Sequence, residues 1–84
     1  MKYEQIQQLK SLYDAGGLKS CRISEVLENN KIVYVIDVTD NNNNLIGLES
    51  FLNHQQYKQI KSGQTAISII KKIGFDMATI KLMY

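Results

Sequence analysis

The residues that could carry out chemistry are few and lie far apart along the chain. The chain of 84 residues has one cysteine, Cys21, and one histidine, His54. A catalytic thiol must be accessible and ionised, but Cys21 alternates with apolar residues in an expected strand and is predicted to be a small buried hydrophobic residue. His54 lies in the polar stretch "NHQQ" and is predicted to be an exposed loop residue. The two residues therefore predict no catalytic pair.

The acidic residues also lack the spacing of a catalytic or metal site. They flank expected turns and strand ends: Glu25, Glu28, Asp37 and Asp40. The stretch "DVTDNNNN" has neither the central glycine nor the closing glutamate of an EF-hand calcium loop, and "AGGL" has no phosphate-binding spacing. We therefore expect no catalytic residue, no metal and no cofactor, and the chain is predicted not to be an enzyme.

The composition of the chain predicts its cellular compartment and its size as a domain. The single cysteine excludes a disulfide within the chain and is typical of a reducing compartment. The stretch "MKYEQIQQLK" lacks the apolar core of a signal peptide, and no run approaches the ~20 apolar residues of a membrane span. We expect a cytoplasmic protein with no membrane contact. Residues 1–84 are predicted to form a single domain with a thin core, which a partner subunit would support.

Positive charge is concentrated in the last third of the chain. Of the overall charge of +2, residues 54–84 contribute five lysines and one acid. A candidate anion-binding patch consists of Lys58, Lys61, Lys71 and Lys72, with Arg22 as a further member. Tyr57 lies beside Lys58 and could stack on a base. Nucleic acid is thus a possible partner but not the favoured one, because AT-rich codon usage also enriches lysine and no sequence-reading motif is present.

Two helices are expected, near the two ends of the chain. In residues 2–14, apolar residues recur at three- and four-residue steps, and Gly16 or Gly17 can adopt the left-handed conformation that ends many helices. In "SGQTAISIIKKIGF", Ser62 is a good N-cap and Gly74 lies where a C-cap belongs. The core-facing stripe of this second helix is predicted to be Ala66, Ile69, Ile70 and Ile73.

The segments between and after the helices are expected to form strands. "KIVYVIDV", residues 31–38, follows Asn29-Asn30, both of which tolerate the positive φ of a type I′ hairpin turn. Its hairpin partner begins near Ser20, and a bulge is expected at Val26 and Leu27, where the alternation breaks. Further strands are expected at residues 45–48, at 57–60 on a sheet edge, and at 77–83. Residues 51–56 are consistent with either a loop or a helical turn.

The strand at residues 31–38 is apolar on both faces and needs two covers. The order α-β-β-β-(β)-α-β predicts an α+β domain, an antiparallel sheet of three to five strands with two helices on one face. The face with Val33 and Val35 is then left for a second copy, which predicts a homodimer. The alternative is a monomer whose sheet curls, so that Phe51, Leu52 and Tyr57 fold over this face.

Two stretches near the ends of the chain carry a resemblance. "LKSLYDAGGLKSCRI" leads into a run of strands, and "IKSGQTAISIIKKIGFDMATIKL" closes the chain. This layout resembles small accessory proteins of plasmids and integrating elements, the ParC-like or partition-associated proteins. The matching positions are Leu9, Leu12, Ala15, Gly16, Ile60, Ser62, Ala66, Ile70 and Gly74, with Ile60 in place of an aromatic residue. The resemblance implies a non-enzymatic bacterial protein of a mobile genetic element that works through protein contacts.

The combined prediction is a protein-interaction module that acts as a homodimer. Its candidate interaction surface is the second sheet face with Val33 and Val35, or the edge around Tyr57. A nucleic-acid-binding protein that uses the C-terminal lysines is the alternative. A small inhibitor of a host or phage machine would have the same sequence features, and the identity of a protein partner stays open.

Overall fold

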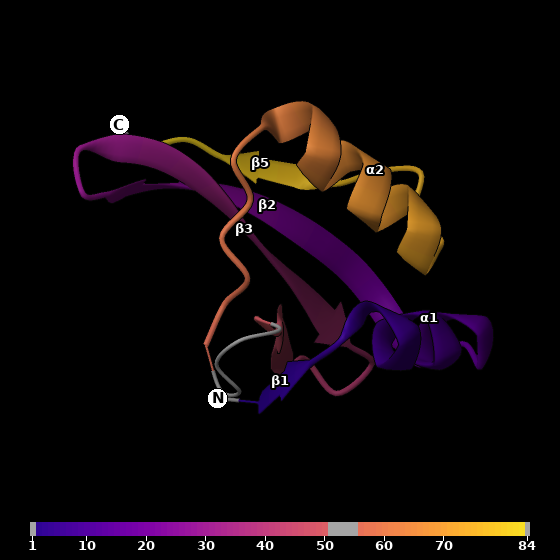
Figure 1. Cartoon of the computed structure of the whole chain (residues 1–84). Coiled ribbons are helices and arrows are strands. Elements are labelled where there is room, and N and C mark those ends of the chain that lie inside the picture. Colours follow the sequence, from indigo (N-terminus) through magenta and orange to yellow (C-terminus); the bar gives the residue numbers. More distant parts are fainter. Residues whose placement is uncertain (1, 51–55, 84) are drawn as a thin grey trace.

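The computed structural model describes residues 2–50 and 56–83, which form one sheet and two helices (Figure 1). The elements in chain order are β1 (Lys2–Glu4), α1 (Ile6–Asp14), β2 (Leu18–Glu28), β3 (Lys31–Asp40), β4 (Leu45–Leu48), α2 (Gly63–Ile73) and β5 (Thr79–Lys81). The strand order in the sheet is β1-β4-β3-β2-β5. The α+β fold class and the order of the predicted elements are confirmed.

The sheet is mixed rather than purely antiparallel. β2, β3 and β4 form the expected antiparallel meander, whereas β1 runs parallel to β4 and β5 runs parallel to β2. β5 reaches its place through α2, and a helical crossover is the connection that lets two strands run in the same direction. The two short strands β1 and β5 are the edges of the sheet.

The β2–β3 hairpin is the longest part of the sheet and follows the predicted turn. Asn29 and Asn30 have φ angles of 51° and 62°, as a type I′ turn requires. Pairing is regular from Glu28 opposite Lys31 onward, so the expected bulge at Val26 and Leu27 is wrong. The irregularity lies instead between Leu18 and Ser20, at the far end of the hairpin.

The first helix is shorter than predicted because its first residues pair with the sheet. Residues 2–4 form β1, in which Tyr3 pairs with Gly47 of β4, and α1 begins only at Ile6. Gly16, with φ of 79°, is the residue that turns the chain after α1. The second helix matches the prediction: Ser62 accepts a hydrogen bond from the Thr65 amide, and the Gly74 amide donates to the Ile70 carbonyl.

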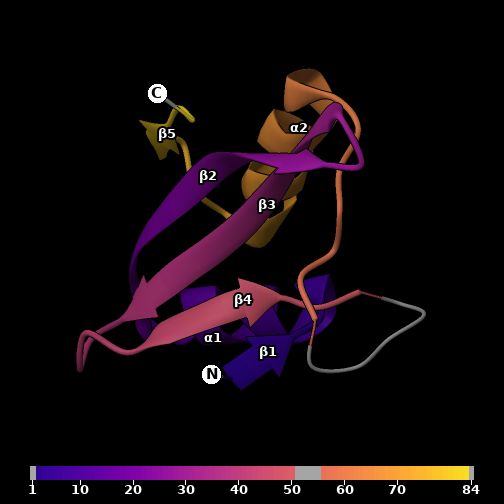
Figure 2. The same cartoon turned by 90° about the vertical axis from the view of Figure 1, so that its left-hand side faces the viewer.

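Both helices cover the same face of the sheet. In Figure 2, α1 and α2 lie behind the strands, and the face toward the viewer carries no helix. The core lies between the helices and the sheet and contains the predicted α2 stripe. Its buried apolar residues are Leu9, Cys21, Ile23, Ile36, Val38, Ile46, Leu48, Ile60, Ala66, Ile69, Ile70, Ile73 and Phe75.

The expected fourth and last strands are reduced in the structure. Residues 57–60 pair through two isolated bridges, Glu49 with Tyr57 and Tyr34 with Ile60. The last strand covers only residues 79–81, and its Ile80 is exposed because β5 is an edge strand. The prediction for residues 51–56 falls almost entirely on residues 51–55, which lie outside the described part of the chain.

Candidate interaction surface

One row of residues crosses all five strands on the face without helices. The pairings place Tyr3, Gly47, Asp37, Arg22 and Thr79 side by side. Paired residues share a face, and neighbours along a strand point to opposite faces. Because Ile36 and Val38 face the helices, this row lies on the opposite side, together with Val33 and Val35. We call this side the second face.

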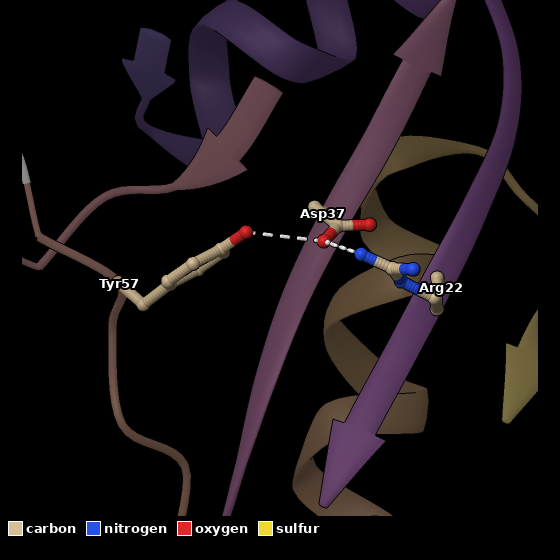
Figure 3. A network of polar contacts seen from close by, with 3 residues as sticks. All are labelled: Arg22, Asp37 and Tyr57. Atoms are coloured by element: carbon tan, nitrogen blue, oxygen red, sulfur yellow. Dashed lines mark hydrogen bonds and ion pairs between the residues drawn. The ribbon is translucent and has the colours of Figure 1, made fainter. Parts of the chain in front are cut away.

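An ion pair between a partly exposed arginine and a buried aspartate lies at the centre of the second face (Figure 3). The Asp37 side chain is only 3% exposed, and its Oδ2 accepts a hydrogen bond of 2.7 Å from Arg22 Nη2. The hydroxyl of Tyr57 donates to the same oxygen over 3.1 Å. These two donors satisfy a carboxylate that would otherwise be costly to bury.

The pKa values of both donors are raised in this environment. The hydrogen bond to Asp37 and its charge raise the pKa of Arg22, so its guanidinium stays charged. Burial, followed by the charge and hydrogen bond of Asp37, raises the pKa of the Tyr57 hydroxyl. Tyr57 therefore remains a neutral donor at ordinary pH and is unsuited to act as a base. The network holds a segment in place rather than preparing a proton transfer.

Two tyrosine rings pack over a glycine beside this network. The rings of Tyr3 and Tyr57 meet edge to face, with their centroids 5.3 Å apart. A Cβ at Gly47 would come within 2.7 Å of the Tyr3 ring and 2.9 Å of the Tyr57 ring. Gly47 is therefore required by close packing, and its missing side chain leaves the space that the two rings occupy.

Backbone hydrogen bonds fix the segment that carries Tyr57. The Lys58 amide donates to the Leu48 carbonyl over 2.8 Å. Two reciprocal bonds of 2.8 and 2.9 Å join the amides and carbonyls of Tyr34 and Ile60. The segment thus continues the sheet beside β3 and directs Tyr57 onto the second face while Ile60 enters the core.

The predicted interaction residues Val33, Val35 and Tyr57 line a single surface pocket. The two alternatives of the sequence prediction, the second face and the surroundings of Tyr57, are therefore one surface. The other lining residues are Tyr3, Val26, Glu28, Gln56 and Gln59. We call this set of eight residues the second-face pocket. Five of these residues are apolar or aromatic and three are polar, a mixture typical of protein interfaces.

Tyr57 also covers part of the second face, for which the sequence analysis expected a second copy or a segment of the same chain as cover. Val33 and Val35 are half-buried in the single chain, which agrees with a sheet partly covered by its own chain. The expected roles of Phe51 and Leu52 in this cover fall outside the described residues. The second-face pocket is one open part of this face.

The predicted anion-binding patch is only partly assembled. Lys58 and Lys72 line the same pocket, whereas Lys61 and Lys71 do not line it. The other residues that line this pocket are Gln5, Ile6, Gln7, Leu48 and Glu49. Arg22 is not part of this patch, because its guanidinium is bound to Asp37 on the second face.

Cys21 is buried, as predicted, and lies in the core. Its Sγ donates a hydrogen bond of 3.2 Å to the Met77 carbonyl. Burial, with a smaller effect from the charge of Asp37, raises the pKa of the thiol to about 11. A thiol in this state is a poor nucleophile at neutral pH. His54, which the sequence analysis predicted to be an exposed loop residue, lies outside the described residues.

The carboxylate of Asp40 stabilises the asparagine-rich loop that follows it. Asp40 Oδ1 accepts hydrogen bonds of 2.9 Å from the amides of Asn42 and Asn44. The bond from Asn44, together with that from Asn42, lowers the pKa of Asp40.

Within residues 2–50 and 56–83, no three acidic, histidine or cysteine side chains form a group that could hold a metal ion. No helix in this part of the chain is long and apolar enough to cross a membrane.

Comparison of the chain with protein-family models, with curated proteins and with solved structures finds no match.

Sequence reasoning placed Asp37 near a strand end and missed its pairing with Arg22. The signal that could have found the pair is the hairpin turn itself. With Asn29 and Asn30 at the tip, residues whose numbers add up to 59 lie opposite each other, as Glu28 and Lys31 do. This rule pairs Arg22 with Asp37, but no sequence feature links either of them to Tyr57.

Proposed function

We propose that this chain is a non-enzymatic protein-interaction module that acts as a homodimer in the bacterial cytoplasm. The observation that supports this best is the second-face pocket, which Val33, Val35 and Tyr57 line together, with the Tyr57 hydroxyl held by its hydrogen bond to Asp37. A Tyr57 side chain that is already held by Asp37 and Tyr3 loses little freedom on binding, which favours affinity. The resemblance of the chain ends to accessory proteins supports service to a mobile genetic element.

The proposed occupant of the pocket is a segment of a partner protein that presents apolar side chains. Val26, Val33 and Val35 provide apolar contacts for this segment, and Gln56 and Gln59 provide hydrogen-bonding groups. Apolar anchors surrounded by polar contacts are the usual basis of specific binding between proteins.

Affinity capture with matched variants tests this proposal. The immobilised chain is exposed to an extract of the bacterium that encodes it, and bound proteins are compared among wild type, Val33→Asp and Ile67→Asp. Ile67 is an exposed residue of α2 that does not line the pocket. We expect a protein that binds wild type and Ile67→Asp but not Val33→Asp, while circular dichroism shows the same helix content in all three. Equal capture by all three variants would contradict the proposal.

The alternative function, nucleic-acid binding, is favoured by one observation, the shared pocket of Lys58 and Lys72. It predicts binding to DNA or RNA that weakens steeply with salt, because phosphate contacts release counterions. Lys58→Glu combined with Lys72→Glu should then weaken binding, and Lys19→Glu, at an exposed site away from this pocket, should have little effect. Absence of binding at low salt would remove this alternative.

A further inference from the structure

The outer edge of β5 is an open strand edge with unusual apolar exposure. β5 ends the strand order, and no described strand pairs with its outer side. Figure 2 shows β5 at the margin of the sheet with no element beyond it. Four of the eight large apolar residues that the described part of the chain exposes lie at or beside this strand: Met77 at 79%, Ile80 at 54%, Leu82 at 47% and Met83 at 43%. An edge of this kind pairs readily with another strand.

We propose that β5 pairs antiparallel with β5 of a second copy, with Ile80 on the two-fold axis. This inference rests on the proposed homodimer and assigns its contact to β5 instead of the face with Val33 and Val35, which the sequence analysis left for a second copy. The two sheets would join into one continuous sheet of ten strands. In a two-fold contact of this kind the β5 edges of both copies pair with each other, so that no β5 edge is left for a third copy.

The order of residues around Ile80 suits this pairing. With Ile80 opposite Ile80 of the second copy, Leu82 lies opposite Ala78 and Met77 lies opposite Met83. Lys81 then faces the polar Thr79, and no two like charges are opposed. Ile80 pairs with Ile23 within its own sheet, so the apolar contact would continue the core across the axis.

The neighbouring two-fold registers are less favourable. A pairing centred on Lys81 places two lysines opposite each other, and like charges in direct opposition destabilise a strand pair. A pairing centred on Thr79 places Lys81 against the apolar Met77. The apolar and charged residues of segment 77–83 therefore select the register centred on Ile80.

This contact would leave the second-face pocket open. The pocket is lined by residues of β1, β2 and β3 and of the segment that carries Tyr57, and none of residues 77–83 lines it. Self-association and partner binding would thus use different surfaces of the chain. This separation makes partner binding at the second-face pocket and self-association through β5 testable independently.

A pair of opposite charges at the axis tests the contact. Ile80→Lys and Ile80→Glu each place like charges opposite each other in the dimer and remove two apolar contacts, so each should raise the dissociation constant at least about 100-fold. Mixed in equal amounts, the two variants should recover a dimer, because lysine then faces glutamate. Light scattering coupled to size exclusion measures the three samples and wild type, with Ile67→Lys as the exposed control.

The outcomes separate this inference from the proposed function. Monomeric single variants and a dimeric mixture support the β5 contact. A wild-type dimer that persists in Ile80→Lys, or a mixture that stays monomeric, overturns the contact but leaves the second-face pocket and its capture test unaffected. If Ile80→Lys fails to fold by circular dichroism, Met77→Glu takes its place, since Met77 is 79% exposed. A dimer of undiminished affinity in Met77→Glu would likewise overturn the contact.

Discussion

Arg22 and Asp37 face each other across the β2–β3 hairpin and form an ion pair in which the carboxylate is buried, with 2.7 Å between Nη2 and Oδ2. The pair lies on the face opposite the helices, where an apolar contact would be the simpler arrangement. Its second donor, Tyr57, comes from a segment 20 residues further along the chain. The ion pair therefore joins the hairpin to the segment that shapes the second-face pocket.

Loss of the Asp37 charge should destabilise the fold and release this segment. Asp37→Asn weakens two hydrogen bonds to a charged group and leaves Arg22 without its counter-ion, so we expect a loss of about 2–3 kcal/mol in the free energy of unfolding. Urea unfolding monitored by circular dichroism measures this value. Asp76→Asn, an exposed carboxylate outside the network, should change it much less. Equal stability of Asp37→Asn and wild type would show that the ion pair has no structural role.

Tyr57→Phe should have a smaller and more local effect. The ring and its contact with Tyr3 remain, but the hydrogen bond to Asp37 is lost, so we expect a cost of about 1.5 kcal/mol. Hydrogen exchange should also become faster at the Lys58 and Ile60 amides, which hold this segment to the sheet. Unchanged exchange at these two amides would mean that the backbone bonds alone fix the segment.

Gly47→Ala should destabilise the chain although alanine is not a bulky residue. The added Cβ would meet the rings of Tyr3 and Tyr57 at 2.7–2.9 Å, and overpacking of this kind costs about 1–3 kcal/mol. Gly63→Ala is the matched control, because its Cβ would meet Tyr34 no closer than 3.7 Å. Thermal unfolding of both variants gives the comparison. A Gly47→Ala variant as stable as Gly63→Ala would contradict the packing described for the two rings.

Cys21 should react slowly in the folded chain and make stability depend on pH in the alkaline range. Its pKa rises from 9.0 to about 11 on folding, so the folded state holds the proton over a range in which the unfolded state has lost it. The stabilisation is full below pH 9 and is lost as the pH rises toward 11. Alkylation at pH 8 should therefore be slow for the native chain and fast in urea. Rapid alkylation of the native chain would show that the thiol is accessible.

Local patterns predicted those parts of the fold that local chemistry determines. Asn29-Asn30 fixed the hairpin turn, and the spacing of Ala66, Ile69, Ile70 and Ile73 fixed the buried stripe of α2. Tyr3 was assigned to a helix because its spacing fits one, but pairing with β4 and packing on Gly47 override that local preference. The parallel pairing of β1 and β5 was not predictable, because it depends on where the chain returns after each helix.

Three residues of the second-face pocket, Val33, Val35 and Tyr57, were named from the sequence, but the contacts that bring them together were not. Val33 and Val35 were identified because strand alternation places them on one face. Their meeting with Tyr57 depends on a contact between distant parts of the chain, which no local pattern encodes. The Asp37 carboxylate was assigned to a strand end because acids are rarely buried, and only its two donors make the buried position acceptable.

The mass of the chain in solution tests the account most directly. Light scattering coupled to size exclusion, over a range of protein concentrations, measures it without a label or a partner. The account predicts a mass of twice the 9.6 kDa of the single chain, with dissociation only on dilution. A mass of 9.6 kDa at every concentration would contradict the homodimer and the β5 contact together.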